Sequence, residues 1–223
     1  MKNKKILHVI SSINPIGGGP IEGLKQRYET LLKFGYVTEV VCSDSPDSQF
    51  ISNYPFKIHA LGPSFFKYAY CPKLFPWLKE NYSNYDAIIV NGIWQYSSYA
   101  VWRALARKKI PYFVFTHGML DPWFKFSYPL KHIKKWLYWP WSDYLVLRDA
   151  QAVFFTSEEE KLQARKSFWL YKCNEEVITY GTSPPPKDIL KLSEDFYLKN
   201  PHLREKRIIL FMSRIHDKKG CAV

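Results

Sequence analysis

The chain has 223 residues, of which 47% are hydrophobic and 23% charged, so a substantial core is expected and global disorder is excluded. Its net charge of +12 favours anionic partners such as nucleotides, anionic lipids or a membrane surface. The apolar runs fall far short of the about 20 residues that span a bilayer, so no transmembrane helix is predicted. The N-terminal MKNKKILHVISS lacks a sustained apolar core and is expected to form a first strand instead of a signal peptide.

The cysteines indicate the compartment. The four are widely scattered and show none of the CxxC or Cys/His spacings typical of a metal site. We therefore expect reduced thiols, a cytoplasmic protein and neither a bound metal nor a cofactor.

Apolar runs of strand length alternate with segments of helix length along the first 180 residues. Strands are predicted at 4–10, 36–42, 57–61, 86–91, 111–117, 152–157 and 176–180. Helices are predicted at 21–34 and 97–109, and Ser157 before three glutamates is typical of a helix N-cap. Continuous apolar strands joined by helices favour a parallel sheet covered on both faces. The predicted fold class is α/β, a Rossmann-like doubly wound, mostly parallel sheet over residues 1–180.

The sequence changes character after Tyr180. The turn and proline-rich stretch GTSPPPKD opens a predicted linker at 181–206, which carries a helix at about 187–199. The run RIILFMS at 207–213 is predicted to be a new strand and the start of a second unit that occupies 207–223.

Ligands of such sheets bind beyond the carboxyl ends of the strands, which directs attention to the residues after each strand. The first strand is followed by Gly17, Gly18 and Gly19 ahead of a helix, where backbone amides attract anions. The dinucleotide fingerprint GxGxxG is not met, because Glu22 and Leu24 stand where a third glycine belongs, and the Walker A pattern is not met, because no GKS or GKT follows. An ordinary tight turn is the alternative interpretation.

Two further strand ends carry candidate residues. The fourth strand is followed by NGIWQY, with Asn91 and Trp94, and the fifth by THGMLDPW, with His117 and Gly118. A lone histidine is often structural, but an imidazole at a strand end can hydrogen-bond a sugar hydroxyl or a phosphate.

The segment 125–150 mixes lysines with tryptophans and tyrosines. This composition suits a membrane interface or an anionic acceptor, and it equally suits aromatics buried against the sheet under solvated lysines. Nucleic acid is not an expected partner, since no known binding motif accompanies the charge.

The last stretch, SRIHDKKG, places Arg214 and Lys219 across a turn that ends in Gly220. Two cations beside the start of a helix would form a receptor for a diphosphate and stabilise a departing nucleotide without a metal. An ordinary charged surface turn is the alternative.

Four motifs in this order resemble the family 4 retaining glycosyltransferases of the GT-B fold. They are INPIGGGP after the first strand, NGIW after the fourth, THGMLDPW after the fifth, and FFTSEEEK near the end of the first domain. SRIHDKKG then resembles the first strand-to-turn of that family's donor-binding domain. The resemblance covers the N-terminal half of a GT-B fold and the opening residues of the second domain.

The resemblance implies roles for these residues in hexosyl transfer from a nucleotide-sugar donor to a hydroxyl acceptor, with retained anomeric configuration. His117 would lie beside the transferred sugar as the catalytic residue, and Arg214 and Lys219 would hold the donor phosphates. The glycines at 17–19 would line the acceptor and the phosphates, and Asn91, Trp94 and Gly118 the acceptor side of the cleft. A glycan or lipid-linked acceptor is implied, as in polysaccharide assembly, and association with the inner face of the membrane is considered.

The resemblance also implies a longer donor domain than this chain contains. We therefore expect an incomplete and inactive fragment of the enzyme. Two alternatives from other classes remain, a non-catalytic module that binds a glycan or anionic lipid, and a nicotinamide-dependent oxidoreductase, against which the unmet glycine fingerprint argues. The nucleotide, sugar and acceptor are not specified by the sequence.

Overall fold

The computed structural model of the chain describes residues 4–106, 108–179, 181, 185–212, 215 and 217. The chain divides into two units, residues 1–181 and residues 182–223. The assignment of 181–206 as a linker and of 207–223 as the start of a second domain stays a prediction.

The first unit is built on one sheet, and the predicted fold class is confirmed. Among the described residues the sheet has seven strands in the order β3-β2-β1-β4-β5-β6-β7, and every pairing is parallel. The strands are β1 Lys4–Ile10, β2 Tyr36–Cys42, β3 Lys57–Ala60, β4 Ala87–Asn91, β5 Tyr112–Phe115, β6 Ala152–Phe155 and β7 Glu175–Val177. The order reverses between β1 and β4, which is where doubly wound sheets bind ligands.

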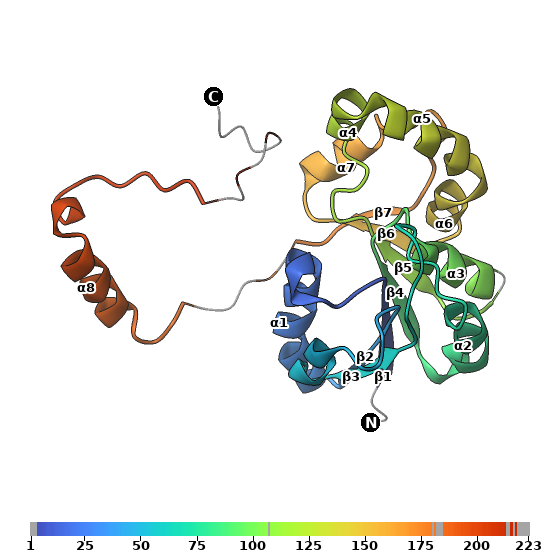
Figure 1. Cartoon of the computed structure of the whole chain (residues 1–223), viewed down its shortest axis with the longest axis horizontal. Coiled ribbons are helices and arrows are strands. Elements are labelled where there is room, and N and C mark those ends of the chain that lie inside the picture. Colours follow the sequence, from blue (N-terminus) through green and yellow to red (C-terminus); the bar gives the residue numbers. More distant parts are fainter. Residues whose placement is uncertain are drawn as a thin grey trace. The chain divides into compact units, whose positions relative to one another are not determined.

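Helices connect the strands. They are α1 Gly19–Lys33, α2 Leu74–Asn81, α3 Tyr96–Leu105, α4 Trp123–Ser127, α5 Pro129–Tyr138, α6 Asp143–Arg148, α7 Glu158–Ala164 and, in the second unit, α8 Ile189–Lys199. Figure 1 shows α1 against one face of the sheet and α2 and α3 against the other. It also shows α4 and α5 beyond the carboxyl end of the sheet, where the chain leaves β5.

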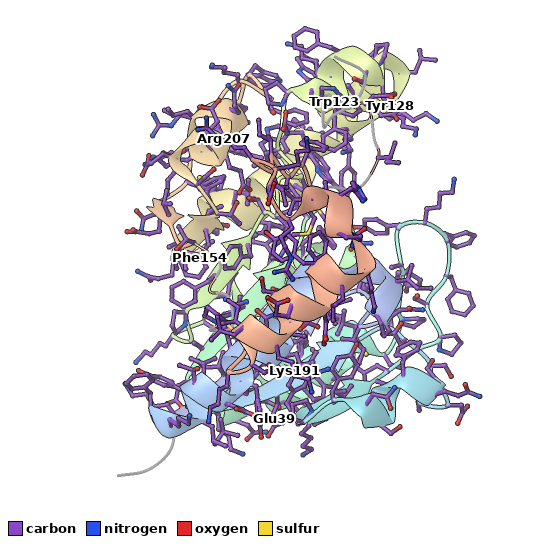
Figure 2. All side chains as sticks on the ribbon, turned by 90° about the vertical axis from the view of Figure 1, so that its left-hand side faces the viewer. Glu39, Trp123, Tyr128, Phe154, Lys191 and Arg207 are labelled. Carbon is purple, nitrogen blue, oxygen red and sulfur yellow. The ribbon has the colours of Figure 1, made fainter. Side chains whose placement is uncertain are left out.

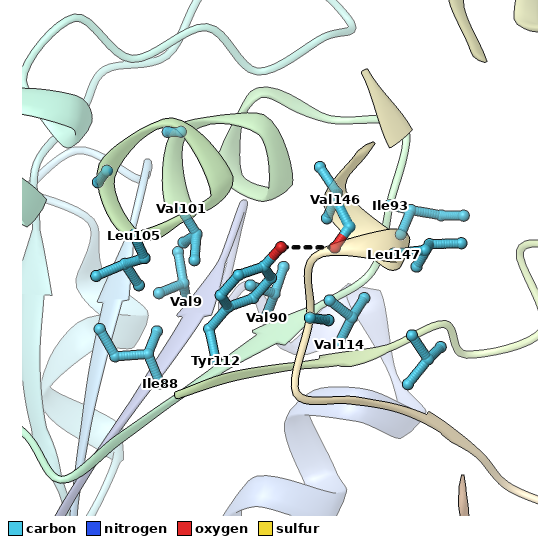
Figure 3. Packing of buried hydrophobic residues seen from close by; sticks show 14 of the residues in the cluster. Val9, Ile88, Val90, Ile93, Val101, Leu105, Tyr112, Val114, Val146 and Leu147 are labelled. Atoms are coloured by element: carbon cyan, nitrogen blue, oxygen red, sulfur yellow. Dashed lines mark hydrogen bonds between the residues drawn. The ribbon is translucent and has the colours of Figure 1, made fainter. Parts of the chain in front are cut away.

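The core lies between the sheet and the helices α2, α3 and α6. Leu7, Val9, Ile88, Val90 and Val114 are fully buried there, because alternate residues of the central strands point to this face. Figure 3 shows this packing around Tyr112, whose hydroxyl donates a hydrogen bond of 2.7 Å to the carbonyl oxygen of Val146. That bond ties β5 to α6, so the segment 116–142 between them, which contains α4 and α5, is held at both ends.

Several predicted bounds change in the structure. β5 ends at Phe115, before the predicted 117, because His117 has a φ of +50° and turns the chain out of the strand. The helices at 74–81 and 143–148 were not predicted. Pro129 and Pro140 each stand at the first turn of a new helical segment, so the 125–150 region forms several short helices.

The predicted strand at 207–213 is wrong for its described part. Residues 207–212 form no strand, and Ile209 and Met212 are 93% and 88% exposed. Pairing with a neighbouring strand is what stabilises a strand, and none of the described strands pairs with residues 207–212. Among the described residues, no helix combines the length and the apolar character that crossing a bilayer requires.

The Tyr112 hydrogen bond gives a test of the core. We expect Tyr112→Phe to lower the free energy of unfolding by about 1–3 kcal/mol, because it leaves the buried Val146 carbonyl without its donor. Urea denaturation measures this change. The half-exposed Tyr70 supplies the matched control, since Tyr70→Phe is expected to change stability by less than about 0.5 kcal/mol. Equal effects of the two substitutions would contradict the assignment.

Candidate active site

The loops after β1, β4, β5 and β6 meet at the carboxyl edge of the sheet, and the loops after β4 and β5 both contain residues with positive φ. His117 and Gly118 follow β5 with φ of +50° and +73°, and Trp94 follows β4 with φ of +69°. Positive φ is costly for residues with a side chain, and such strain concentrates at functional sites. The surrounding structure must therefore hold both turns in place.

Glu160, on α7, holds the turn after β5. Its Oε1 accepts hydrogen bonds of 2.7 Å from both the Thr116 hydroxyl and the Gly118 backbone N–H. Its Oε2 accepts from the backbone N–H and the hydroxyl of Thr156, at 2.8 and 2.6 Å. Burial raises the pKa of this carboxyl, but the four donors outweigh burial and leave the pKa below its usual range. Glu160 is thus an ionised clamp between the ends of β5 and β6.

Asn91, buried at the end of β4, joins two histidines. Its Oδ1 lies 3.3 Å from Nε2 of His117, and its Nδ2 lies 3.2 Å from Nδ1 of His8, in β1. An amide oxygen only accepts and an amide nitrogen only donates, so His117 carries its proton on Nε2 and His8 carries its proton on Nε2 as well. Nδ1 is then the hydrogen-bond acceptor of the His117 ring.

Both histidines are held neutral. Burial lowers the pKa of His8 to about 3 and that of His117 to about 4; the Arg27 charge acts in the same direction, and Glu160 opposes it at His117. Below the ordinary histidine pKa the unfolded chain binds more protons than the folded one. The contribution of these rings to stability is therefore lost as pH falls from about 6.5 through the folded values.

The glycine loop lies at the same edge, after β1. Gly18 has a φ of +72° and precedes α1, and a Cβ built on Gly18 or Gly19 would meet nothing within 4 Å. Asp44, after β2, fixes the start of this loop by accepting hydrogen bonds from the Ser12 hydroxyl and the Ile13 backbone N–H, at 2.7 and 2.8 Å. The loop is therefore anchored at its base and borders open space at Gly18 and Gly19.

Trp94 faces a small cavity on the other side of the β4 turn. Its indole N–H donates to the Met119 carbonyl at 3.1 Å, and its backbone N–H donates to Asp143 at 3.0 Å. The Lys135 ammonium lies 4.4 Å from the centre of the Trp94 ring, a cation–π contact. The cavity measures about 60 Å³ and is lined mostly by aromatic and basic side chains, among them Trp94, Phe124, Lys131 and Lys135.

Burial shifts the pKa values of two oppositely charged side chains near Trp94. Asp143 is fully buried, which raises its pKa to about 6, although the Trp94 N–H, the Ser98 hydroxyl and Lys135 all favour the ionised form. Burial likewise lowers the pKa of Lys135. Groups with perturbed pKa values beside a cleft are candidates for function. Here Lys135 lines the cavity, and Asp143 is bonded to the backbone of Trp94, which also lines it.

The structure thus brings Asn91, Trp94, His117 and Gly118 together around the β4 and β5 turns, with the glycine loop at the same edge. Arg214 and Lys219 lie outside the described residues. Four residues of the site were not predicted from the sequence, namely His8, Asp44, Asp143 and Glu160. For Glu160 the local pattern, Ser157 before three glutamates, predicted only a helix N-cap. That cap is present, with the Ser157 hydroxyl accepting from the Glu160 N–H at 3.1 Å. Among the described residues no group of His, Cys, Asp or Glu could hold a metal ion.

Glu160 offers a direct test of the clamp. In Glu160→Gln one carboxylate oxygen becomes an NH₂ group that faces a backbone N–H, so we expect a loss of about 2–4 kcal/mol in the free energy of unfolding. Glu159→Gln is the matched control on the same helix, because Glu159 is exposed and accepts a hydrogen bond from the side chain of Gln163, on the same helix. A Glu160→Gln protein as stable as this control in urea denaturation would refute the clamp.

Comparison with known proteins assigns the chain to a family. Two solved structures are similar to it, sucrose-phosphate synthase from Thermosynechococcus elongatus and the Anabaena protein HepE in complex with UDP and glucose. The first is 18% identical with a TM-score of 0.59, covering 86% of this chain and 52% of that one. The second is 16% identical with a TM-score of 0.50, covering 88% and 51%.

At these identities the likeness establishes the fold, and the chain spans about half the length of either structure. No curated protein gives a significant sequence match. Residues 18–181 match the family described as the glycosyl transferase 4-like domain, and this segment contains the turns after β4, β5 and β6. The family resemblance drawn from the four sequence motifs is confirmed. Because the match extends over more than half of the chain, the protein belongs to the glycosyl transferase 4-like domain family.

Proposed function

We propose that the chain forms the acceptor side of a retaining glycosyltransferase that moves a hexose from a nucleotide sugar to a hydroxyl group. The observation that carries this proposal is the neutral His117, fixed by Asn91 and by the Glu160-clamped turn, in a chain of the glycosyl transferase 4-like family. A neutral ring at a strand end is suited to hydrogen-bonding a sugar hydroxyl.

In the proposed reaction the bond between the anomeric carbon and the donor phosphate breaks, and a bond from the acceptor oxygen to the same carbon forms on the same face. The nucleoside diphosphate leaves with the bonding electron pair, and a phosphate oxygen of that leaving group takes the proton from the acceptor hydroxyl. Charge develops on the departing diphosphate, so cations and backbone amides there supply most of the stabilisation. Arg214 and Lys219 are proposed for that role, and the Gly17–Gly19 loop is proposed to approach the phosphates.

His117 is proposed to hold the transferred sugar in position. Nδ1 is the acceptor nitrogen in the tautomer that Asn91 selects, so it suits a sugar hydroxyl as donor. A pKa of about 4 keeps the ring neutral at neutral pH and gives it no charge to attract the leaving phosphate. Positioning is therefore favoured over electrostatic stabilisation as the role of this residue.

The acceptor is proposed to bind beside Trp94. The cavity there combines an indole face with Lys131 and Lys135, which suits a glycan or an acceptor that carries a negative charge. The same features support the second candidate, a module that binds a glycan or anionic lipid without catalysis. Catalysis is favoured because binding alone does not require a strained turn held by an ionised carboxylate.

The 223-residue chain alone is proposed to be inactive. A nucleotide sugar held by this chain alone keeps its phosphates in contact with water, where each electrostatic interaction is weak. We expect the 223-residue chain to transfer no detectable sugar from UDP-glucose or other nucleotide sugars, measured by release of the nucleoside diphosphate. UDP-glucose is tested first because HepE was solved with UDP and glucose. Robust turnover by this chain would contradict the inactivity.

The transferase proposal is tested separately on the longest product of the same gene from its native source. We expect that protein to transfer a hexose with retained anomeric configuration, and His117→Ala to lower kcat/KM by about 10²-fold or more. His202→Ala, at an exposed site in the second unit, is the control. Reduction of a nicotinamide cofactor, or unchanged turnover in His117→Ala, would overturn the assignment.

A further inference from the structure

The segment that contains α4 and α5 turns its apolar residues outward. Phe126, Leu130, Ile133, Leu137 and Trp141, named here the α5 face, are 77%, 77%, 56%, 67% and 76% exposed. Phe126, in α4, and Trp141, after α5, lie at the two ends of this set along the chain. Leu130, Ile133 and Leu137 are spaced three and four residues apart within α5, so they share one side of that helix. A helix that packs on a core would bury this side, so the α5 face is an apolar stripe that unit 1 leaves uncovered.

The inner side of the same segment is already occupied. Lys135 lies on the Trp94 ring, the His132 ring stacks on Phe168 at 4.9 Å, and Trp139 is fully buried. A rotation of α5 that buried the apolar stripe would therefore break these contacts and expose Trp139. The outward orientation is fixed by packing. Figure 2 shows Trp123 and Tyr128 in this segment, at the end of the unit away from Glu39.

The charge around the stripe has one sign. Residues 122–142 contain four lysines and no Asp or Glu, and three of these lysines are not on the inner side, where Lys135 contacts Trp94. The neighbouring segment adds Lys166 and Lys172, while Arg165 is ion-paired with Glu175. Trp136 and Trp169 contribute two more part-exposed rings, whose centres lie 5.8 Å apart. Apolar residues, a border of lysines and amphipathic indoles are the composition of a surface that lies in a membrane interface.

We propose that the α5 face docks on a membrane of anionic lipids, with its apolar stripe at the boundary between headgroups and acyl chains. The lysines beside it contact the lipid phosphates, and Trp136, Trp141 and Trp169 lie at headgroup depth. An anionic lipid surface fits better than a protein groove, because a wide, one-signed border with scattered tryptophans matches a flat charged surface. Single apolar anchors in a defined pocket are what a protein groove selects.

The docked orientation has a consequence that rests on the proposed function. A cavity of about 480 Å³ lies between α5 and Trp169, and it shares His132, Ser167 and Phe168 with the smaller cavity beside Trp94. Docking would therefore turn the entrance of the proposed acceptor site toward the lipid headgroups. The docking itself requires no transferase activity, so its test is independent of the sugar-transfer assay.

Vesicle co-sedimentation of the 223-residue chain tests the proposal. We expect binding to vesicles of phosphatidylcholine with about one third phosphatidylglycerol, and weak binding to phosphatidylcholine alone. Binding to the anionic vesicles is expected to fall as salt rises, because counterions screen the lysine contacts. Leu130→Ser with Leu137→Ser is expected to weaken partitioning about tenfold or more, since two inserted apolar side chains are lost.

Matched variants on α8 distinguish this surface from general stickiness. Leu190 and Leu198 are 82% and 73% exposed, so Leu190→Ser with Leu198→Ser removes the same groups from a different helix. Lys131→Gln with Lys134→Gln is likewise compared with Lys191→Gln with Lys199→Gln. The α5 variants are expected to lose vesicle binding while their circular dichroism spectra stay unchanged. The α8 variants are expected to retain vesicle binding.

Three results would overturn the proposal. Equal binding to neutral and anionic vesicles would remove the role of the lysines, and loss of binding in the α8 variants alone would place the contact elsewhere. The third uses light scattering on the same proteins. If the chain is an oligomer that Leu130→Ser with Leu137→Ser converts to a monomer without changing vesicle binding, a second copy of the chain covers the α5 face.

Discussion

The ionised carboxylate of Glu160 is the interaction on which the rest of the site depends. Its four hydrogen bonds join the ends of β5 and β6 and hold the turn that carries His117 and Gly118 at positive φ. Asn91 then selects the tautomer of the His117 ring, and burial keeps that ring neutral. A strained turn, an oriented amide and an uncharged imidazole together form one preorganised element at the edge of the sheet.

Much of the fold followed from the sequence. The bounds of β1 and β2 agree with prediction to the residue, because apolar runs ended by Gly, Ser or Asp are unambiguous in a parallel sheet. The helices of the 123–148 region did not follow, because prolines divide them and α5 carries its apolar residues outward. A prediction from periodicity that assumes a buried apolar side would place these exposed residues of α5 in the core.

The sequence predicted only part of the candidate site, because some of its hydrogen bonds join residues that are far apart along the chain. His117, Asn91 and Trp94 stand at strand ends, so the topology of the sheet identifies them. Glu160 lies 44 residues from Thr116, and only the parallel register of β5 and β6 brings the two together. Asp143, the first residue of α6, likewise bonds the backbone of Trp94 across 49 residues. Hydrogen bonds between residues so far apart leave no pattern in the local sequence, whereas the helix cap at Ser157 involves neighbouring residues and can be recognised there.

The neutral, oriented His117 is the central claim, and nitrogen NMR of its imidazole tests it most directly. In a long-range proton–nitrogen spectrum, with the signal assigned by its loss in His117→Gln, the account predicts a neutral ring with its proton on Nε2. That spectrum should persist from neutral pH down toward the pKa of about 4. A ring that is charged at pH about 6, or protonated on Nδ1, would contradict the account.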